Sequence, residues 1–197
     1  IITDISDPVH PVVIEKEIAD VLVPYHLDVD GGLSVNGFTA LALDQNSLYL
    51  VGEKRIYHLD ITLPTDPILL ATHYLEYSIR DVEAKDEMLY VSHSGGISVY
   101  KETSDRTLEL LHTVGRTELS GTPGKLFIAE KSIWATMPNS RKIVEVELFS
   151  GEFNIVRSFR SYDHNGLRIK PDDLLVIKDR LLVSTGSSGT VQLYIID

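Results

Sequence analysis

A proline-containing motif occurs twice in this chain at one fixed spacing. Asp4, Ile5, Ser6, Pro8 and Pro11 return as Asp60, Ile61, Thr62, Pro64 and Pro67, an offset of 56 residues that both prolines preserve. An apolar run follows each copy, and a strand-like stretch ending at the aspartate precedes it. Because proline fixes φ and donates no backbone hydrogen bond, it interrupts a strand ladder at a defined place. The motif therefore predicts a recurring turn between two β-strands.

A pair of short apolar strands joined by a turn recurs four times, at residues 48–60, 89–101, 133–147 and 181–195. Positions equivalent to the motif aspartate are spaced by 56, 41, 46 and 50 residues and fall at Asp4, Asp60, Lys101, Glu147 and Asp197. Four-stranded propeller blades repeat at about 40 to 50 residues. The chain is therefore predicted to be an all-β β-propeller of four-stranded antiparallel blades, with four blade units.

The repeat divides the chain into units of one propeller fragment. They are placed at residues 1–18 (partial), 38–78, 79–117, 121–163 and 170–197 (partial), with an insertion at 19–37. Insertions in repeat proteins map to loops and often to a binding face, so the insertion is a candidate partner-contact arm. The inner and second strands of each unit are almost wholly apolar, as expected for sheets that neighbouring blades cover on both faces.

Both ends of the chain fall inside the third strand of a unit, so one strand is duplicated. A closed ring of four blades would leave the duplicate unpaired, and bare strand edges favour association. We therefore expect a larger ring of six to eight blades. The further blades would come from sequence outside this fragment or from another chain.

Composition excludes several classes of function. The formal net charge of -11 and the pI near 5.0 oppose nucleic-acid binding, which depends on basic groups. No run approaches the ~18 consecutive apolar residues of a spanning helix, so membrane insertion is not expected, and any export signal must lie outside the fragment. The absence of cysteine excludes disulfides, thiolate metal sites and cysteine nucleophiles.

The segment Ile2 to Pro11 resembles the repeat of the LVIVD-repeat proteins, whose units run roughly L-x-V-x-D-V-S-D-P-x-x-P. Residues 59–67 fit nearly as well, whereas the third and fourth units have lost the prolines. The resemblance implies a propeller at the prokaryotic cell envelope or outside the cell. It also implies a noncatalytic binding role with a protein or glycan partner and no cofactor.

Ligands of propellers usually bind near the axis on the face formed by the loops between the second and third strands and between blades. Polar side chains expected on that face are Arg80, Asp81, His93, Asn139, Arg141, His164, Asn165 and Asp173. The alternative is that these side chains cap turns and pair with one another. His58 and His73 fall inside predicted strands, where partly exposed rim positions are expected, and no Ser-His-Asp trio is predicted.

A second resemblance suggests an enzyme. Residues 164–173 are similar to the N-G-L-x-x-x-P-D phrase of calcium-dependent lactonases and strictosidine-synthase-like six-bladed propellers. That resemblance implies a Ca²⁺ held by oxygen ligands, here Asn165 and Asp173, in a metal-dependent hydrolase. The other units carry Thr39, Arg80 and Gly124 where the family would place further ligands. The leading hypothesis is therefore the binding module, and the hydrolase is the alternative.

Overall fold

The computed structural model describes residues 2–4, 12–14, 38–52, 54–149, 152–162, 165–178, 180–185 and 190–195. These residues form β-strands, turns and one short 3-10 turn, η2 (Pro138–Ser140), which confirms the all-β prediction. Within these ranges no helix is long and apolar enough to cross a membrane. The predicted insertion at 19–37 and the first copy of the Asp-Ile-Ser turn lie outside the described residues.

The strands form antiparallel sheets that follow the chain in simple order, as predicted for propeller blades. Blade 1 contains β3 (Ala40–Asp44), β4 (Ser47–Gly52), β5 (Arg55–Asp60) and β6 (Ile68–Tyr74). Blade 2 contains β7 (Ile79–Lys85), β8 (Met88–His93), β9 (Gly96–Glu102) and β10 (Leu108–Gly115). Blade 3 contains β11 (Leu126–Ile128), β12 (Ser132–Met137), β13 (Lys142–Phe149) and β14 (Glu152–Arg160).

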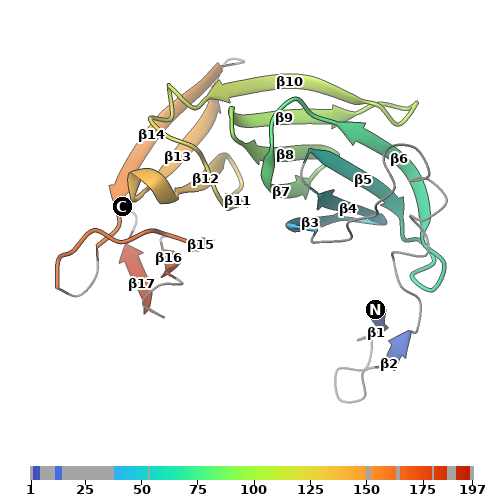
Figure 1. The fold of residues 1–197 in the computed structure, drawn as a ribbon, viewed down its shortest axis with the longest axis horizontal. Helices are drawn as coiled ribbons and strands as arrows, with labels where there is room; N and C mark the ends of the chain where they lie inside the picture. Colours follow the sequence, from blue (N-terminus) through green and yellow to red (C-terminus); the bar gives the residue numbers. More distant parts are fainter. Residues whose placement is uncertain are drawn as a thin grey trace, which may run out of the picture.

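Blade 4 has three described strands, β15 (Asp173–Ile177), β16 (Arg180–Thr185) and β17 (Thr190–Ile195). A separate pair is formed by β1 (Ile2–Asp4) and β2 (Val12–Ile14). The sheets follow one another round an arc, with β1 and β2 near one end and blade 4 at the other (Figure 1). The four-blade propeller architecture is therefore confirmed.

Within each blade the innermost strand comes first in sequence, and the inner strands β3, β7, β11 and β15 contact their neighbours round the arc. The chain then returns through tight hairpins. Asp86 and Glu87 both have positive φ, the geometry of a two-residue hairpin turn. Gly96 has φ +148°, and a Cβ at this position would lie 2.1 Å from the Val114 carbonyl oxygen, so the start of β9 requires glycine.

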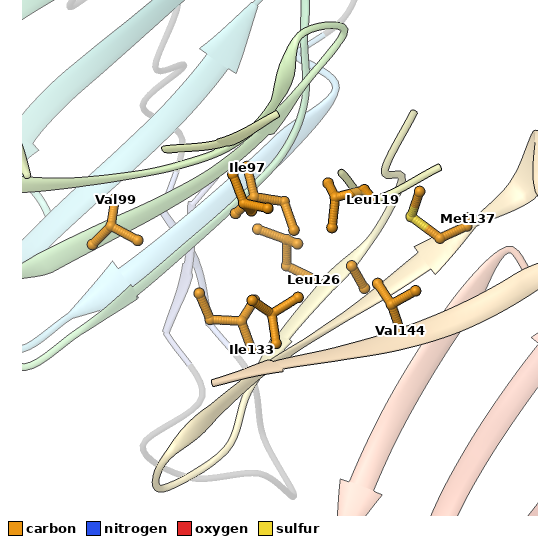
Figure 2. Close-up of a cluster of buried hydrophobic side chains, with 10 residues drawn as sticks. Ile97, Val99, Leu119, Leu126, Ile133, Met137 and Val144 are labelled. Carbon is orange, nitrogen blue, oxygen red and sulfur yellow. The ribbon is translucent and has the colours of Figure 1, made fainter. Parts of the chain in front are cut away.

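Apolar side chains fill the junctions between blades. Between blades 2 and 3 they come from both sheets and include Ile97, Val99, Leu126, Ile133 and Val144 (Figure 2). A similar cluster lies between blades 1 and 2, and another lies between blades 3 and 4. Alternation along each strand therefore presents apolar side chains to both neighbours, which explains why the inner and second strands read as continuous apolar runs.

Candidate functional site

The two edges of the blades carry different connections. We call the edge with the loops between second and third strands the loop face, where the predicted site lies. The opposite edge, with the tight hairpins between first and second strands, is called the hairpin face. Arg80, Asn139, Arg141, Asn165 and Asp173 are exposed, whereas Asp81 and His93 are buried. His164 lies outside the described residues.

The Asp81 carboxylate joins two blades. Its Oδ1 accepts a hydrogen bond from the Lys125 ammonium at 2.7 Å, and its Oδ2 accepts one from the backbone N–H of Leu126 at 2.8 Å. On the adjacent strand, Ser92 Oγ donates to the Gly124 carbonyl at 2.5 Å. Burial raises the pKa of Asp81, although both hydrogen bonds act in the opposite direction. These contacts fix the start of β11 against blade 2.

His93 is the centre of a second buried network. Its ring stacks on Tyr77, with centroids 5.0 Å apart. The Gly95 N–H donates to Nδ1 at 3.1 Å, so the ring proton lies on Nε2 and points to Ser98 Oγ at 2.8 Å. Ser98 Oγ lies 2.9 Å from Thr113 Oγ1. Burial lowers the pKa of His93, so the ring is neutral near pH 7.

The exposed candidates do not converge on one centre. Arg141 donates to the Arg168 carbonyl at 3.3 Å, and the Asp173 carboxylate accepts the N–H of its neighbour Leu174 at 2.8 Å. Within the described part of the chain, no three His, Asp or Glu side chains are grouped so that they could hold a metal ion. Glu83 is a further carboxylate and lies inside β7, away from the loops at either end of the strand. Burial, then the charge of Asp81, raises its pKa to about 7.

A polar network at the hairpin face was not predicted. His58 is fully buried rather than partly exposed, which corrects the expectation for this residue. Its Nε2 lies 2.9 Å from Ser47 Oγ, and its Nδ1 lies 3.2 Å from Glu102 Oε1 without the alignment of a hydrogen bond. Tyr49 stacks on the His58 ring and donates its hydroxyl to Glu102 Oε2 at 2.9 Å. The network spans blades 1 and 2.

Ser47, His58 and Glu102 have the residue types of a catalytic triad, in which a base lies between a nucleophile and a carboxylate. However, the ring of His58 lies in a stacked, fully buried position between two sheets. Blade 3 places a related set in the same register, in which Ser132 donates to Glu145 at 2.9 Å and Arg157 lies 3.3 Å from Glu145. We therefore interpret both sets as polar connections of the sheets.

A pocket of about 240 Å³ opens between blades 2 and 3 at the hairpin face. Its walls are mainly apolar and come from β8, β9 and β10 of blade 2 and from all four strands of blade 3. The lining residues are Met88, Tyr90, Val99, Leu111, His112, Ile128, Ala129, Glu130, Lys131, Ser132, Ile133, Val146 and Phe153. His112 and Phe153 meet edge to face, with centroids 5.7 Å apart. This pocket lies on the face opposite to the predicted one. Its residues come from distant segments, so no sequence motif marks it.

No protein-family model matches the chain, and no curated protein sequence matches it significantly. Solved structures with the same fold include the computationally designed Ika4 protein, with a TM-score of 0.61 and 18% identity over 86% of this chain and 96% of that chain. A protein from Lactobacillus plantarum has a TM-score of 0.59 and 15% identity over 80% of this chain and 54% of that chain. A Bacteroides uniformis protein provisionally named a 6-phosphogluconolactonase has a TM-score of 0.66 and 15% identity over 80% of this chain and 50% of that chain.

The chain thus spans about half the length of the two natural proteins and nearly all of the designed one. Identities this low support a common propeller fold and nothing finer.

Proposed function

We propose that this chain is a noncatalytic propeller module that binds a protein partner through the pocket between blades 2 and 3. The observation that carries the proposal is the pocket itself, an opening with mainly apolar walls between two sheets. The repeat that resembles the LVIVD proteins supports the binding role and an extracellular or cell-envelope location. The noncatalytic part of the proposal is supported by Asp81, His93 and His58. Their polar atoms bind other groups of the protein, between or within blades.

The size and polarity of the pocket indicate the kind of ligand. At about 240 Å³ it is smaller than the ~300 to 1,000 Å³ of sites for cofactors and drug-sized molecules, so it fits one side chain of a partner. Met88, Val99 and Phe153 provide apolar walls, while Glu130 and Lys131 stand at the rim. A sugar would leave most of its hydroxyls without partners against such walls. A protein with a protruding aromatic or aliphatic side chain therefore fits better than a glycan.

The two methionines of the chain provide a direct test. Met88 lines the pocket, whereas Met137 is fully buried in the cluster between blades 2 and 3. In a protein labelled with [¹³C-methyl]methionine, N-acetyl-tryptophanamide should shift the Met88 signal with a roughly millimolar Kd and leave Met137 in place. Methyl β-glucoside should shift neither signal.

A pocket-filling variant completes the test. Ile128→Trp adds bulk on the side of β11 that lines the pocket and should abolish the Met88 shift, while Ala71→Leu on the outer strand β6 should leave it unchanged. No shift of Met88 at saturating amide concentration in the unmodified chain would refute the proposal. A response to the glucoside alone would replace the protein partner with a glycan.

The second candidate is a divalent-metal hydrolase. It is favoured by the provisional naming of the similar Bacteroides uniformis propeller as a 6-phosphogluconolactonase and by the phrase that contains Asn165 and Asp173. A ligand that binds only the folded chain raises its melting temperature. Thermal melts with Ca²⁺, Mg²⁺ and Zn²⁺, together with a 6-phosphogluconolactone hydrolysis assay, therefore separate the two functions. A clear metal-dependent rise in Tm, lost in Asn165→Ala, would favour the hydrolase.

A further inference from the structure

One face of blade 4 exposes large apolar side chains. Leu175 and Ile177 lie two residues apart on β15 and point to the same face of the sheet. Leu175 pairs with Leu182 on β16, which pairs with Leu193 on β17, and Val191 lies on the same face two residues before Leu193. Val191 is 64% exposed and Leu193 is 56% exposed. We call Leu175, Ile177, Val191 and Leu193 the blade-4 face. The opposite face of the same sheet packs against blade 3 through Leu174, Leu181 and Val183.

The pairing register shows what covers this face in the other blades. Val191 pairs with the fifth residue of the second strand in its blade, as do Ile56 in blade 1, Ile97 in blade 2 and Ile143 in blade 3. All three isoleucines are 0% exposed, and each belongs to an apolar cluster shared with the next blade. The blade-4 face is therefore built to receive another blade.

A polar feature supports the same conclusion independently. Asp173 pairs with Ser184 in blade 4, as Asp81 pairs with Ser92 in blade 2. In blade 2 these two side chains bind the backbone of the next inner strand, at the Leu126 N–H and the Gly124 carbonyl. Blade 4 repeats this arrangement at the edge of the blade-4 face. Its expected occupant is therefore an inner β-strand with exposed apolar side chains.

The other end of the arc offers such a strand. Leu41 on β3 is 61% exposed, and Leu43 is 56% exposed. The register aligns Leu41 with Val82, Leu126 and Leu174, which are buried against the preceding blade. We call Leu41 and Leu43 the blade-1 face. On the same side of blade 1, Leu50, Tyr57 and Leu59 are buried, so the open part of this side is its inner strand. The chain thus carries the blade-4 face at one end of the arc and an open inner strand on blade 1, toward the other end (Figure 1).

We propose that two copies of this chain associate head to tail, the blade-4 face of each copy packing on the blade-1 face of the other. A second copy offers a partner to both exposed faces at once and forms two identical junctions about a two-fold axis, which closes the assembly. Each new junction would resemble the apolar junction between blades 2 and 3 (Figure 2). The natural propellers that match are longer than this chain, which covers 54% and 50% of their lengths.

Solution mass tests the proposal first. Sedimentation and light scattering of the 197-residue chain should give twice the monomer mass of 22.0 kDa at micromolar concentration. The net charge of -11 on each copy opposes association, and salt screens this repulsion. Because salt does not weaken apolar burial, the dimer should become more stable as NaCl is raised from 50 to 500 mM.

Two single variants define the direction of the contact. Leu193→Asp damages the blade-4 face and Leu41→Asp damages the blade-1 face, so each alone should be monomeric. In an equimolar mixture, one junction contains both substitutions and the other contains neither, so heterodimers should form again. Leu63→Asp changes a residue that is 64% exposed in a turn away from both faces, and this variant should remain dimeric. Unchanged far-ultraviolet circular dichroism verifies that each variant is folded.

Three outcomes would overturn the proposal. The first is a monomeric wild-type chain at all concentrations and salt conditions. The second is a dimer that Leu193→Asp abolishes and Leu41→Asp leaves intact, because that pattern describes two blade-4 faces in contact. The third is growth into larger assemblies with concentration, because head-to-tail contacts that do not close build open filaments.

Discussion

The carboxylate of Asp81 and the ammonium of Lys125 lie 2.7 Å apart across the junction between blades 2 and 3. The same carboxylate accepts the backbone N–H of Leu126, so one side chain from an inner strand fixes the first residues of the next inner strand. Apolar clusters fill the rest of the junction. Adjacent blades are therefore joined by nondirectional burial and by directional polar contacts, and the polar contacts set the register of one sheet on the next.

Asp81→Ala should destabilise the chain by about 2 to 3 kcal/mol, because it leaves the Leu126 N–H and the Lys125 ammonium without their partner. Lys125 is partly exposed, which limits the loss. Asp81→Asn retains an acceptor for the N–H and removes a buried charge, so it should cost less than about 1 kcal/mol. Urea denaturation of both variants measures the difference. Equal losses in the two variants would contradict this role.

Glu83 should make the chain less stable as the pH rises. Its pKa is raised from 4.5 to about 7, so between these values the native state binds more protons than the unfolded state and the free energy of unfolding falls with increasing pH. Glu83→Gln removes this dependence. The free energy of unfolding of the variant, relative to that of the wild type, should therefore be higher at pH 8 than at pH 4.5 by on the order of 1 to 2 kcal/mol. Thermal melts across this range provide the measurement, and the exposed Glu109→Gln is the control, which should follow the wild-type profile.

His93 should titrate below its ordinary value and hold its proton on Nε2. Burial lowers its pKa, and the Gly95 N–H occupies Nδ1. As the pH falls below about 6.5, the unfolded chain takes up a proton that the native ring resists, so stability decreases toward acid. Long-range ¹H–¹⁵N spectra give both the tautomer and the titration midpoint. A proton on Nδ1, or a midpoint above 6.5, would exclude the hydrogen-bond pattern seen here.

His93→Phe should retain the stacking on Tyr77 but leave the Gly95 N–H without its acceptor and Ser98 Oγ with one partner, Thr113, in place of two. A loss of about 1 to 3 kcal/mol is expected. Because the variant cannot titrate, its acid destabilisation should also be weaker than that of the wild type. Chemical denaturation at pH 5 and pH 7.5 measures both effects. An unchanged pH dependence would assign the acid sensitivity to other groups, such as His58 and His73, whose pKa values are also lowered by burial.

Strand pattern and repeat spacing were sufficient to predict the propeller, because alternation and turn residues are local properties of the chain. Asp81 and His93 lie at the loop face, and their burial and partners depend on the neighbouring strands and loops. His58 shows the limit most clearly. It lies between Tyr57 and Leu59 in a strand, and only the packing of blade 2 brings Glu102 to its ring. The pocket beside Met88 likewise exists only after two sheets have packed.

Tyr49 and Glu102 should be energetically coupled across the junction of blades 1 and 2. The Tyr49 hydroxyl donates to Glu102 Oε2 at 2.9 Å, and burial raises the pKa of this phenol, so it remains a donor at neutral pH. Glu102 Oε1 also accepts a hydrogen bond from Arg106 at 3.0 Å. Tyr49→Phe alone should cost about 1 to 2 kcal/mol, and Glu102→Gln should cost a similar amount.

In the double variant, the loss should be smaller than the sum of the two single losses by about 1 kcal/mol, because the shared hydrogen bond is then removed only once. Urea denaturation of the four proteins completes the cycle. Tyr57→Phe combined with Glu102→Gln is the matched control: the Tyr57 side chain belongs to the cluster on the other face of blade 1, so its loss should add to that of Glu102 without coupling. Strict additivity of Tyr49→Phe and Glu102→Gln would mean that their hydrogen bond contributes nothing to the junction.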